Sequence, residues 1–173
     1  MKHSLSLLLG LAIVLSWACA PVAPPEEESK VNVNDVAPTF SYTLLDGTVV
    51  DSDSLQGQVI LLTFFATWCP PCKKELPLIQ SEIHEKITDS AFTLVVSGRG
   101  HTVEELQKFQ QEKGYTFPIA ADPDATLYDT FATQYIPRNY VIGKDGKIKW
   151  ASAGFSESEF NQMVQIIRNE LAN

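Results

Sequence analysis

The stretch TFFATWCPPCKKELP, residues 63–77, brings two kinds of secondary structure together in this chain of 173 residues. A near-continuous apolar run at 59–65 leads into it and predicts a strand that is buried on both faces of a sheet. Apolar residues then recur at helical spacing and predict a helix over 72–86, kinked at Pro77. The two cysteines of the stretch therefore lie at a strand-to-helix junction, where open α/β sheets place their chemistry.

The elements expected on either side complete an α/β pattern with one domain and no internal repeat. Asp46-Gly47 marks one hairpin turn and Asp145-Gly146 a second. Thr102 and Glu105 form a capping box that opens a helix ending near Gly114. Further elements are expected at 92–96, 117–120, 124–131, 140–142, 147–152 and from 156 onward.

The composition excludes some classes of partner. The formal net charge is -8, and 45% of the residues are hydrophobic, which is enough for a sizeable core. So acidic a chain is a poor nonspecific ligand for nucleic acids or anionic membrane surfaces, and neither is expected as a partner.

The N-terminus is interpreted as a signal peptide, residues 1–18, followed by a tether, 19–36, and the working domain, 37–173. A positive Lys2 precedes an apolar run at 5–15. That run has the length of a signal-peptide core and is too short to span a membrane. The proline-rich and then acidic composition of the next segment fits an extended tether.

Cys19 has a separate expected role. The residues before it resemble a bacterial lipoprotein signal, which implies that Cys19 becomes the lipidated N-terminus. Ordinary secretion and an uncleaved anchor are the alternatives. All three place the domain outside the cytoplasm, and the first makes it a periplasmic protein that contacts a membrane only through its lipid.

The cysteine pair has the features of a redox site. Cys69 is placed at the N-cap of the helix, where the partial positive charge of the helix favours a thiolate, and Cys72 lies within reach of a disulfide. Pro70 and Pro71 fill the first two helical positions and have no N–H to donate to the Cys69 sulfur. We infer a thiolate that is only moderately stabilised, which makes the pair more reducing.

Two other interpretations of the pair are weaker. A structural disulfide here would close a tiny loop and constrain the unfolded chain little. A zinc site needs about four ligands, whereas the chain offers one CxxC pair and three histidines, one of them in the signal peptide. The pattern favours a redox-active disulfide that needs no metal and no other cofactor.

These residues resemble a known family. Trp68-Cys69-Pro70-Pro71-Cys72-Lys73 is similar to the thioredoxin active site, and Ile136-Pro137 before a strand resembles that family's cis-proline. The segments 37–40, 73–77 and 102–120 resemble the TlpA/ResA-like group of exported thiol–disulfide oxidoreductases, which has AhpC/TSA-like relatives. The resemblance implies a thioredoxin fold: a central mixed β-sheet flanked by helices, with an N-terminal β-hairpin and an inserted helix–strand unit.

The resemblance also implies roles for single residues. Cys69 would be the exposed attacking nucleophile and Cys72 the resolving thiol tucked inside. Glu75 sits where this group has an acid near the second cysteine, and would take or give the Cys72 proton. Ordinary thioredoxins have a buried aspartate at the position of Thr63. The residues expected to line the substrate groove are Trp68, Pro70, Pro71, Ile136 and Pro137, the last with a cis peptide bond.

Three further residues are interpreted as structural. Arg138, beside the expected cis-proline, is taken as surface charge. Arg99 and His101 follow a strand and are taken as a loop with a polar cap, although they would lie at the same rim of the sheet as the cysteines.

The expected function is reduction of disulfides in exported proteins by thiol exchange. The resemblance suggests cytochrome c apoproteins among the substrates and a membrane electron donor that recharges the oxidised pair. A peroxiredoxin-like thiol peroxidase and a lipid-tethered binding module with a redox switch are the alternatives.

Overall fold

A computed structural model gives the structure of the chain and describes residues 28–173. The expected signal peptide, Cys19 and the first part of the expected tether lie outside the described residues. Within the described range, no helix has both the length and the apolar character needed to cross a membrane.

The centre of the domain is a mixed sheet with the strand order β2-β1-β5-β4-β3-β6-β7. The fully buried β3 (Val59–Phe65) pairs in parallel with β4 (Phe92–Arg99) and antiparallel with β6 (Arg138–Ile142). The other strands are β1 (Ser41–Leu44), β2 (Val49–Asp51), β5 (Ile119–Asp122) and β7 (Ile148–Ala153). The expected hairpins form β1–β2 and β6–β7, and β5 enters the sheet between β4 and the first hairpin.

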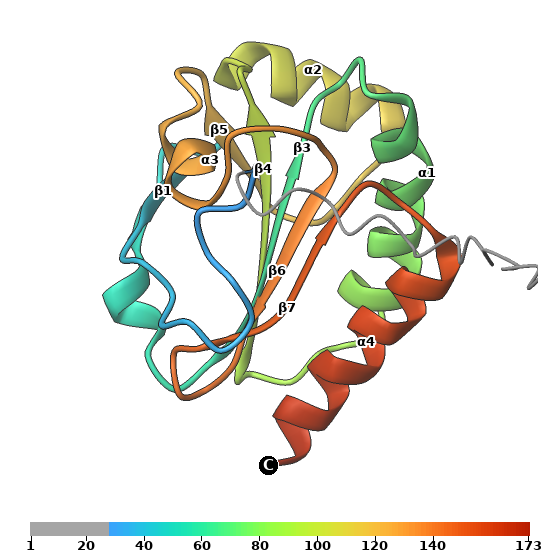
Figure 1. Cartoon of the computed structure of the whole chain (residues 1–173). Coiled ribbons are helices and arrows are strands. Elements are labelled where there is room, and N and C mark those ends of the chain that lie inside the picture. Colours follow the sequence, from blue (N-terminus) through green and yellow to red (C-terminus); the bar gives the residue numbers. More distant parts are fainter. Residues whose placement is uncertain (1–27) are drawn as a thin grey trace, which may run out of the picture.

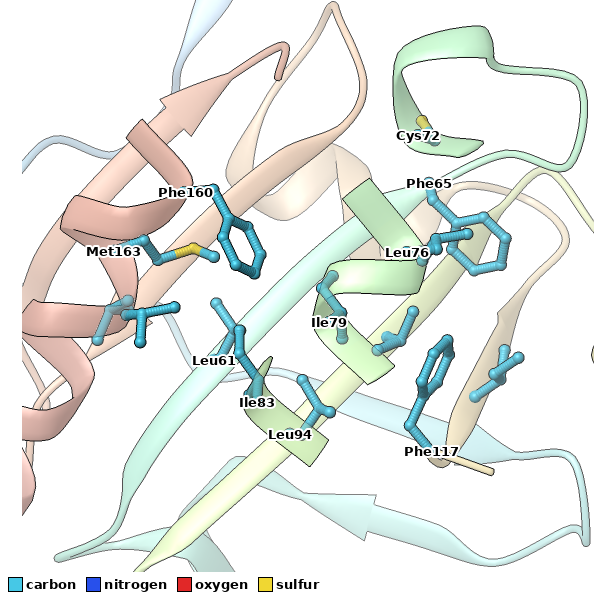
Figure 2. Packing of buried hydrophobic residues seen from close by; sticks show 14 of the residues in the cluster. Leu61, Phe65, Cys72, Leu76, Ile79, Ile83, Leu94, Phe117, Phe160 and Met163 are labelled. Carbon is cyan, nitrogen blue, oxygen red and sulfur yellow. The ribbon is translucent and has the colours of Figure 1, made fainter. Parts of the chain in front are cut away.

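Helices cover both faces of the sheet, and each face has its own apolar cluster. One cluster joins alternate residues of β3 to α1 (Pro70–Leu78), α2 (Val103–Lys113) and α4 (Glu157–Ala172). Figure 1 shows α1 and α4 side by side, and Figure 2 shows Leu61 and Phe65 of β3 among the buried side chains of this cluster. The opposite face packs against α3 (Thr126–Phe131) and the N-terminal segment. The expected thioredoxin fold, with its leading hairpin and inserted α2–β5 unit, is confirmed.

The helix after the cysteines changes its winding where the kink was expected. Pro77 lies inside α1, and the chain continues as a π-helical turn over Ile79–His84. Proline lacks the N–H that an α-helix needs at that point, and π-turns and kinks commonly follow such a break. Ile79 and Ile83 remain buried on the sheet, so the apolar face is preserved.

The N-terminal segment 28–36 lies against the domain, although it was expected to belong to the tether. Ser29 forms a bridge with Ala132, and Val36 forms one with Lys147. Val31 is buried in the apolar cluster of this face. Segment 28–36 therefore belongs to the folded domain, because backbone pairing and one buried valine hold it in place.

Arg138 is buried beneath this segment, so its interpretation as surface charge is wrong. Its Nη1 atom donates a hydrogen bond to the carbonyl oxygen of Glu28 at 2.8 Å and another to the Tyr140 hydroxyl at 3.3 Å. A buried guanidinium needs such partners, and segment 28–36 supplies one of them across 110 residues of sequence.

Candidate active site

The cysteine pair forms a disulfide at the start of α1, directly beyond the end of β3. The S–S distance is 2.09 Å and the Cα–Cα distance is 5.3 Å. Cys69 is the N-cap residue, and its sulfur accepts a hydrogen bond from the backbone N–H of Cys72 at 3.2 Å. Pro70 and Pro71 occupy the first two helical positions, so the N-cap arrangement expected from the sequence is confirmed.

Both cysteines are buried in this oxidised state. The expectation that Cys69 is exposed is therefore wrong for the oxidised protein. Cys69 is 2% exposed and Cys72 is 0% exposed. The Cys69 sulfur is bonded to Cys72 on one side and lies 3.6 Å from the carbonyl oxygen of Ile136 on another. Figure 2 places Cys72 at the end of the apolar cluster that also holds Phe65 and Leu76.

The segment before β6 forms the second wall of the site. The Ile136–Pro137 peptide bond is cis, as expected. The carbonyl oxygen of Pro137 accepts a hydrogen bond from the N–H of Gly154 at 2.8 Å, which fixes this segment to the end of β7. The Ile136 carbonyl is thereby held facing the Cys69 sulfur.

The residues expected to line the groove differ in exposure. Trp68 is 66% exposed and Pro70 is also exposed, whereas Pro71 and Ile136 are half-buried and Pro137 is buried. Sequence reasoning missed Tyr135, which is exposed and has φ 67°, a left-handed conformation that is uncommon for a residue with a side chain. The hydroxyl of the buried Tyr128 donates a hydrogen bond to the Tyr135 carbonyl oxygen at 2.8 Å. The only signal in the sequence was an aromatic residue two positions before the proline.

Glu75 is a buried acid on the same face of α1 as Cys72, three residues further on. Its Oε1 atom accepts a hydrogen bond from Asn139 Nδ2 at 2.7 Å. Burial raises the pKa of Glu75 from 4.5 to about 7, although the Asn139 hydrogen bond acts in the opposite direction. A carboxyl group with this pKa can both take and give a proton near neutral pH.

The loop after β4 contacts the loop that carries the cysteines. The backbone N–H of Thr67 donates to His101 Nε2 at 3.1 Å, and His101 Nδ1 lies 3.2 Å from Glu105 Oε2. An acceptor at Nε2 requires the proton on Nδ1, which then donates to the carboxylate. His101 therefore does more than cap its own loop, because it also fixes the backbone two residues before Cys69. Arg99 instead stacks on the Tyr128 ring, 4.1 Å from its centroid.

A CxxC disulfide at a helix N-cap, opposite a cis-proline and above a buried acid, defines a thiol–disulfide oxidoreductase of thioredoxin fold. A family model agrees with this class. The model of the AhpC/TSA family matches residues 33–151, and the chain belongs to that family.

Individual relatives have similar descriptions. The chain is 29% identical over 122 residues to the thiol-disulfide oxidoreductase ResA of Bacillus thuringiensis (strain Al Hakam), with 70% of each chain covered. A solution structure from Bacteroides thetaiotaomicron, provisionally described as a protein disulfide isomerase, is 35% identical with a TM-score of 0.81, covering 84% of this chain and 94% of that one.

A third similar protein is the pneumococcal exposed lipoprotein thioredoxin Etrx1 of Streptococcus pneumoniae strain TIGR4. Its crystal structure gives a TM-score of 0.61 at 26% identity, covering 74% of this chain and 98% of that one. With the site geometry, these similarities make the chain a thiol–disulfide oxidoreductase that acts on protein thiols.

Proposed function

We propose that the chain works as a reductase of disulfides in exported proteins, outside the cytoplasm, attached to a membrane by a lipid on Cys19. The observation that carries the reducing direction is the double proline at the start of α1. Pro70 and Pro71 have no N–H, so the Cys72 amide is the backbone donor bonded to the Cys69 sulfur. A thiolate with so few donors is weakly stabilised, and a weakly stabilised dithiol gives up its electrons readily.

The exchange takes two steps. The Cys69 thiolate attacks one sulfur of a client disulfide, forms a mixed disulfide and releases the other client sulfur as a thiolate. The Cys72 sulfur then attacks Cys69, the Cys69–Cys72 disulfide forms, and the second client sulfur leaves. The client disulfide gains two electrons and the enzyme dithiol loses two.

The surrounding groups support this sequence of events. Trp68 and Tyr135 are exposed on the two segments that meet at Cys69, and offer apolar surface to a client chain. Glu75 is the group that exchanges a proton with Cys72 during the second step. After turnover, a membrane dithiol donor reduces the disulfide again. Cytochrome c apoproteins, which need free thiols for haem attachment, are the client class we propose.

The reduction potential of the Cys69–Cys72 pair tests the direction. Equilibration of the full chain with glutathione or dithiothreitol buffers is expected to give a value near that of thioredoxin, about -270 mV. Pro71→Ala adds one N–H near the Cys69 sulfur, and is expected to raise the potential by about 30 mV or more, since such a bond to a thiolate is worth about 1.5 kcal/mol or more.

Pro77→Ala is the matched control, because it adds an N–H to the same helix away from the sulfur, and it should leave the potential unchanged. A wild-type value near that of a strong periplasmic oxidant, about -120 mV, would make the protein a disulfide donor and overturn the proposal.

Lipidation of Cys19 is tested by detergent-phase partitioning of the full chain expressed in a bacterium that processes lipoproteins. The wild-type protein is expected in the detergent phase and the Cys19→Ser variant in the aqueous phase, since one acyl chain adds about 0.8 kcal/mol of membrane affinity per buried methylene. Mass spectrometry of the N-terminal peptide identifies the modification. Equal partitioning of the two proteins would show that Cys19 carries no anchor.

A further inference from the structure

A row of polar residues crosses the otherwise apolar face of the sheet beneath α1. Thr63 is the one polar residue of β3, and it lies between Leu61 and Phe65 on the face covered by α1. The strand register pairs Thr63 with Asn139 of β6, and Asn139 with Ser152 of β7. Thr63 and Asn139 are both fully enclosed by protein, and uncompensated polar groups are costly there, so their hydrogen bonds decide their orientation.

The hydrogen bonds fix the Asn139 amide in one orientation. The Thr63 hydroxyl donates to Asn139 Oδ1 at 2.7 Å. An oxygen that faces Thr63 leaves the Nδ2 group on the other side, where it donates to Glu75 Oε1 at 2.7 Å and lies 3.4 Å from the Ser152 hydroxyl. Hydrogen bonds are therefore donated in one direction along this network, from Thr63 to Asn139 and from Asn139 to Glu75.

The second carboxyl oxygen of Glu75 is left available. Glu75 Oε2 is buried and has no hydrogen-bond partner within residues 28–173. Cys72 lies one turn earlier on the buried face of the same helix, and residues three apart on a helix are neighbours. Held at Oε1, the carboxyl group has its other oxygen free for the Cys72 thiol.

We propose that Asn139, oriented by Thr63, is the positioning residue that holds the Glu75 carboxyl group for proton transfer from Cys72. The inference rests on the proposed function, since it concerns the second step of the same exchange. The Cys72 thiol gives its proton to Glu75 Oε2, and its sulfur attacks Cys69 of the mixed disulfide. The Cys69–Cys72 bond forms, the bond from Cys69 to the client sulfur breaks, and the client thiolate takes its proton from water.

The second step can be timed with an aromatic disulfide that releases a coloured thiolate at each step. The reduced full chain, with Cys19→Ser so that two cysteines remain, reacts with Ellman's reagent over a range of pH in a stopped-flow instrument. The first release reports attack by Cys69 and the second reports resolution by Cys72. In the wild-type sequence the rate of the second release is expected to rise through an inflection set by Glu75.

Asn139→Leu removes the donor that favours the ionised form of Glu75. The inflection is expected to move upward by about one pH unit or more, with about a tenfold slower second release at neutral pH. Thr63→Val is expected to shift the inflection in the same direction as Asn139→Leu but by a smaller amount, because the Asn139 amide loses only the hydroxyl that orients it. Thr63→Ser keeps the hydroxyl and is expected to retain the wild-type profile. Ser97→Ala, at a buried serine of β4 outside this network, is the matched control.

The outcomes separate the inference from the proposed function. An unshifted inflection in both Asn139→Leu and Thr63→Val, with Glu75→Gln abolishing it, would overturn the positioning role and leave the exchange mechanism intact. Should Asn139→Leu fail to fold, the Thr63→Val and Thr63→Ser pair decides the question alone. Absence of any second release in the wild-type sequence would overturn the proposed function together with the inference.

Discussion

Replacing Cys69 by Ser is expected to abolish disulfide reduction by this protein, leaving only the rate of the uncatalysed reaction. The reason is chemical, since the thiolate is the nucleophile of exchange and a serine hydroxyl does not attack a disulfide. The measurement is reduction of insulin disulfides by the full chain with dithiothreitol as electron source, followed by turbidity. Cys19→Ser is the matched control and is expected to keep the wild-type rate, because the proposed exchange uses only Cys69 and Cys72.

Cys72→Ser gives a different expected result and sharpens this test. Cys69 remains able to attack, but the mixed disulfide with the client is not resolved, so a covalent complex accumulates on a non-reducing gel. Full insulin reduction by the Cys69→Ser variant would refute the assignment of the nucleophile. If the covalent complex accumulated with Cys69→Ser instead of with Cys72→Ser, Cys72 would be the nucleophile and Cys69 the resolving cysteine.

Glu75→Gln is expected to remove much of the dependence of stability on pH between about 4.5 and 7. The pKa of Glu75 is 4.5 when unperturbed and about 7 in the folded protein, because burial disfavours the charged form. Well below pH 4.5 the carboxyl group is protonated in both the folded and the unfolded state and does not reduce the free energy of unfolding. As the pH rises toward 7 the unfolded chain ionises and the folded one does not, so stability is lost.

The size of this loss follows from the shift in pKa. A difference of this size corresponds to about 3 kcal/mol of folding free energy, fully lost above about pH 7. Urea unfolding of the oxidised full chain at pH 5 and pH 8 measures it. The wild-type protein is expected to lose about 2.5 kcal/mol more between these values than Glu75→Gln, because the unfolded chain is already partly ionised at pH 5. Glu104→Gln, at an exposed position of α2, controls for the loss of one acidic residue. Parallel pH curves for wild type and Glu75→Gln would contradict the raised pKa.

Local patterns in the sequence predicted the elements and the centre of the site. The apolar run of β3, the capping box at Thr102 and the N-cap position of Cys69 all rest on residues within a few positions of one another. Such short-range signals survive in a single sequence, because the backbone hydrogen bonds and helix ends that they describe are themselves local. The resemblance added the cis-proline, which no local pattern would have revealed.

Long-range contacts account for what the sequence did not show. Arg138 was taken as surface charge, and only the fold brings it beneath segment 28–36. No sequence pattern singled out Asn139, although it meets Glu75 across 64 positions. The carbonyl oxygen that lies 3.6 Å from the Cys69 sulfur belongs to Ile136, 67 positions away. Hydrophobic periodicity carries no information about which polar groups will meet in a core.

The docked N-terminal segment, together with the proposed lipid on Cys19, would limit where the enzyme can work. The Glu28 carbonyl oxygen accepts hydrogen bonds from Thr133 and Arg138, on either side of the cis-proline segment, so the described part of the chain begins at the reactive end of the domain. If Cys19 carries the lipid, as proposed, eight residues (20–27) separate it from the docked segment, and a chain of that length spans at most about 30 Å. The disulfide would then stay close to the bilayer surface. Membrane-bound donors would be within its reach, and clients deeper in the compartment would not.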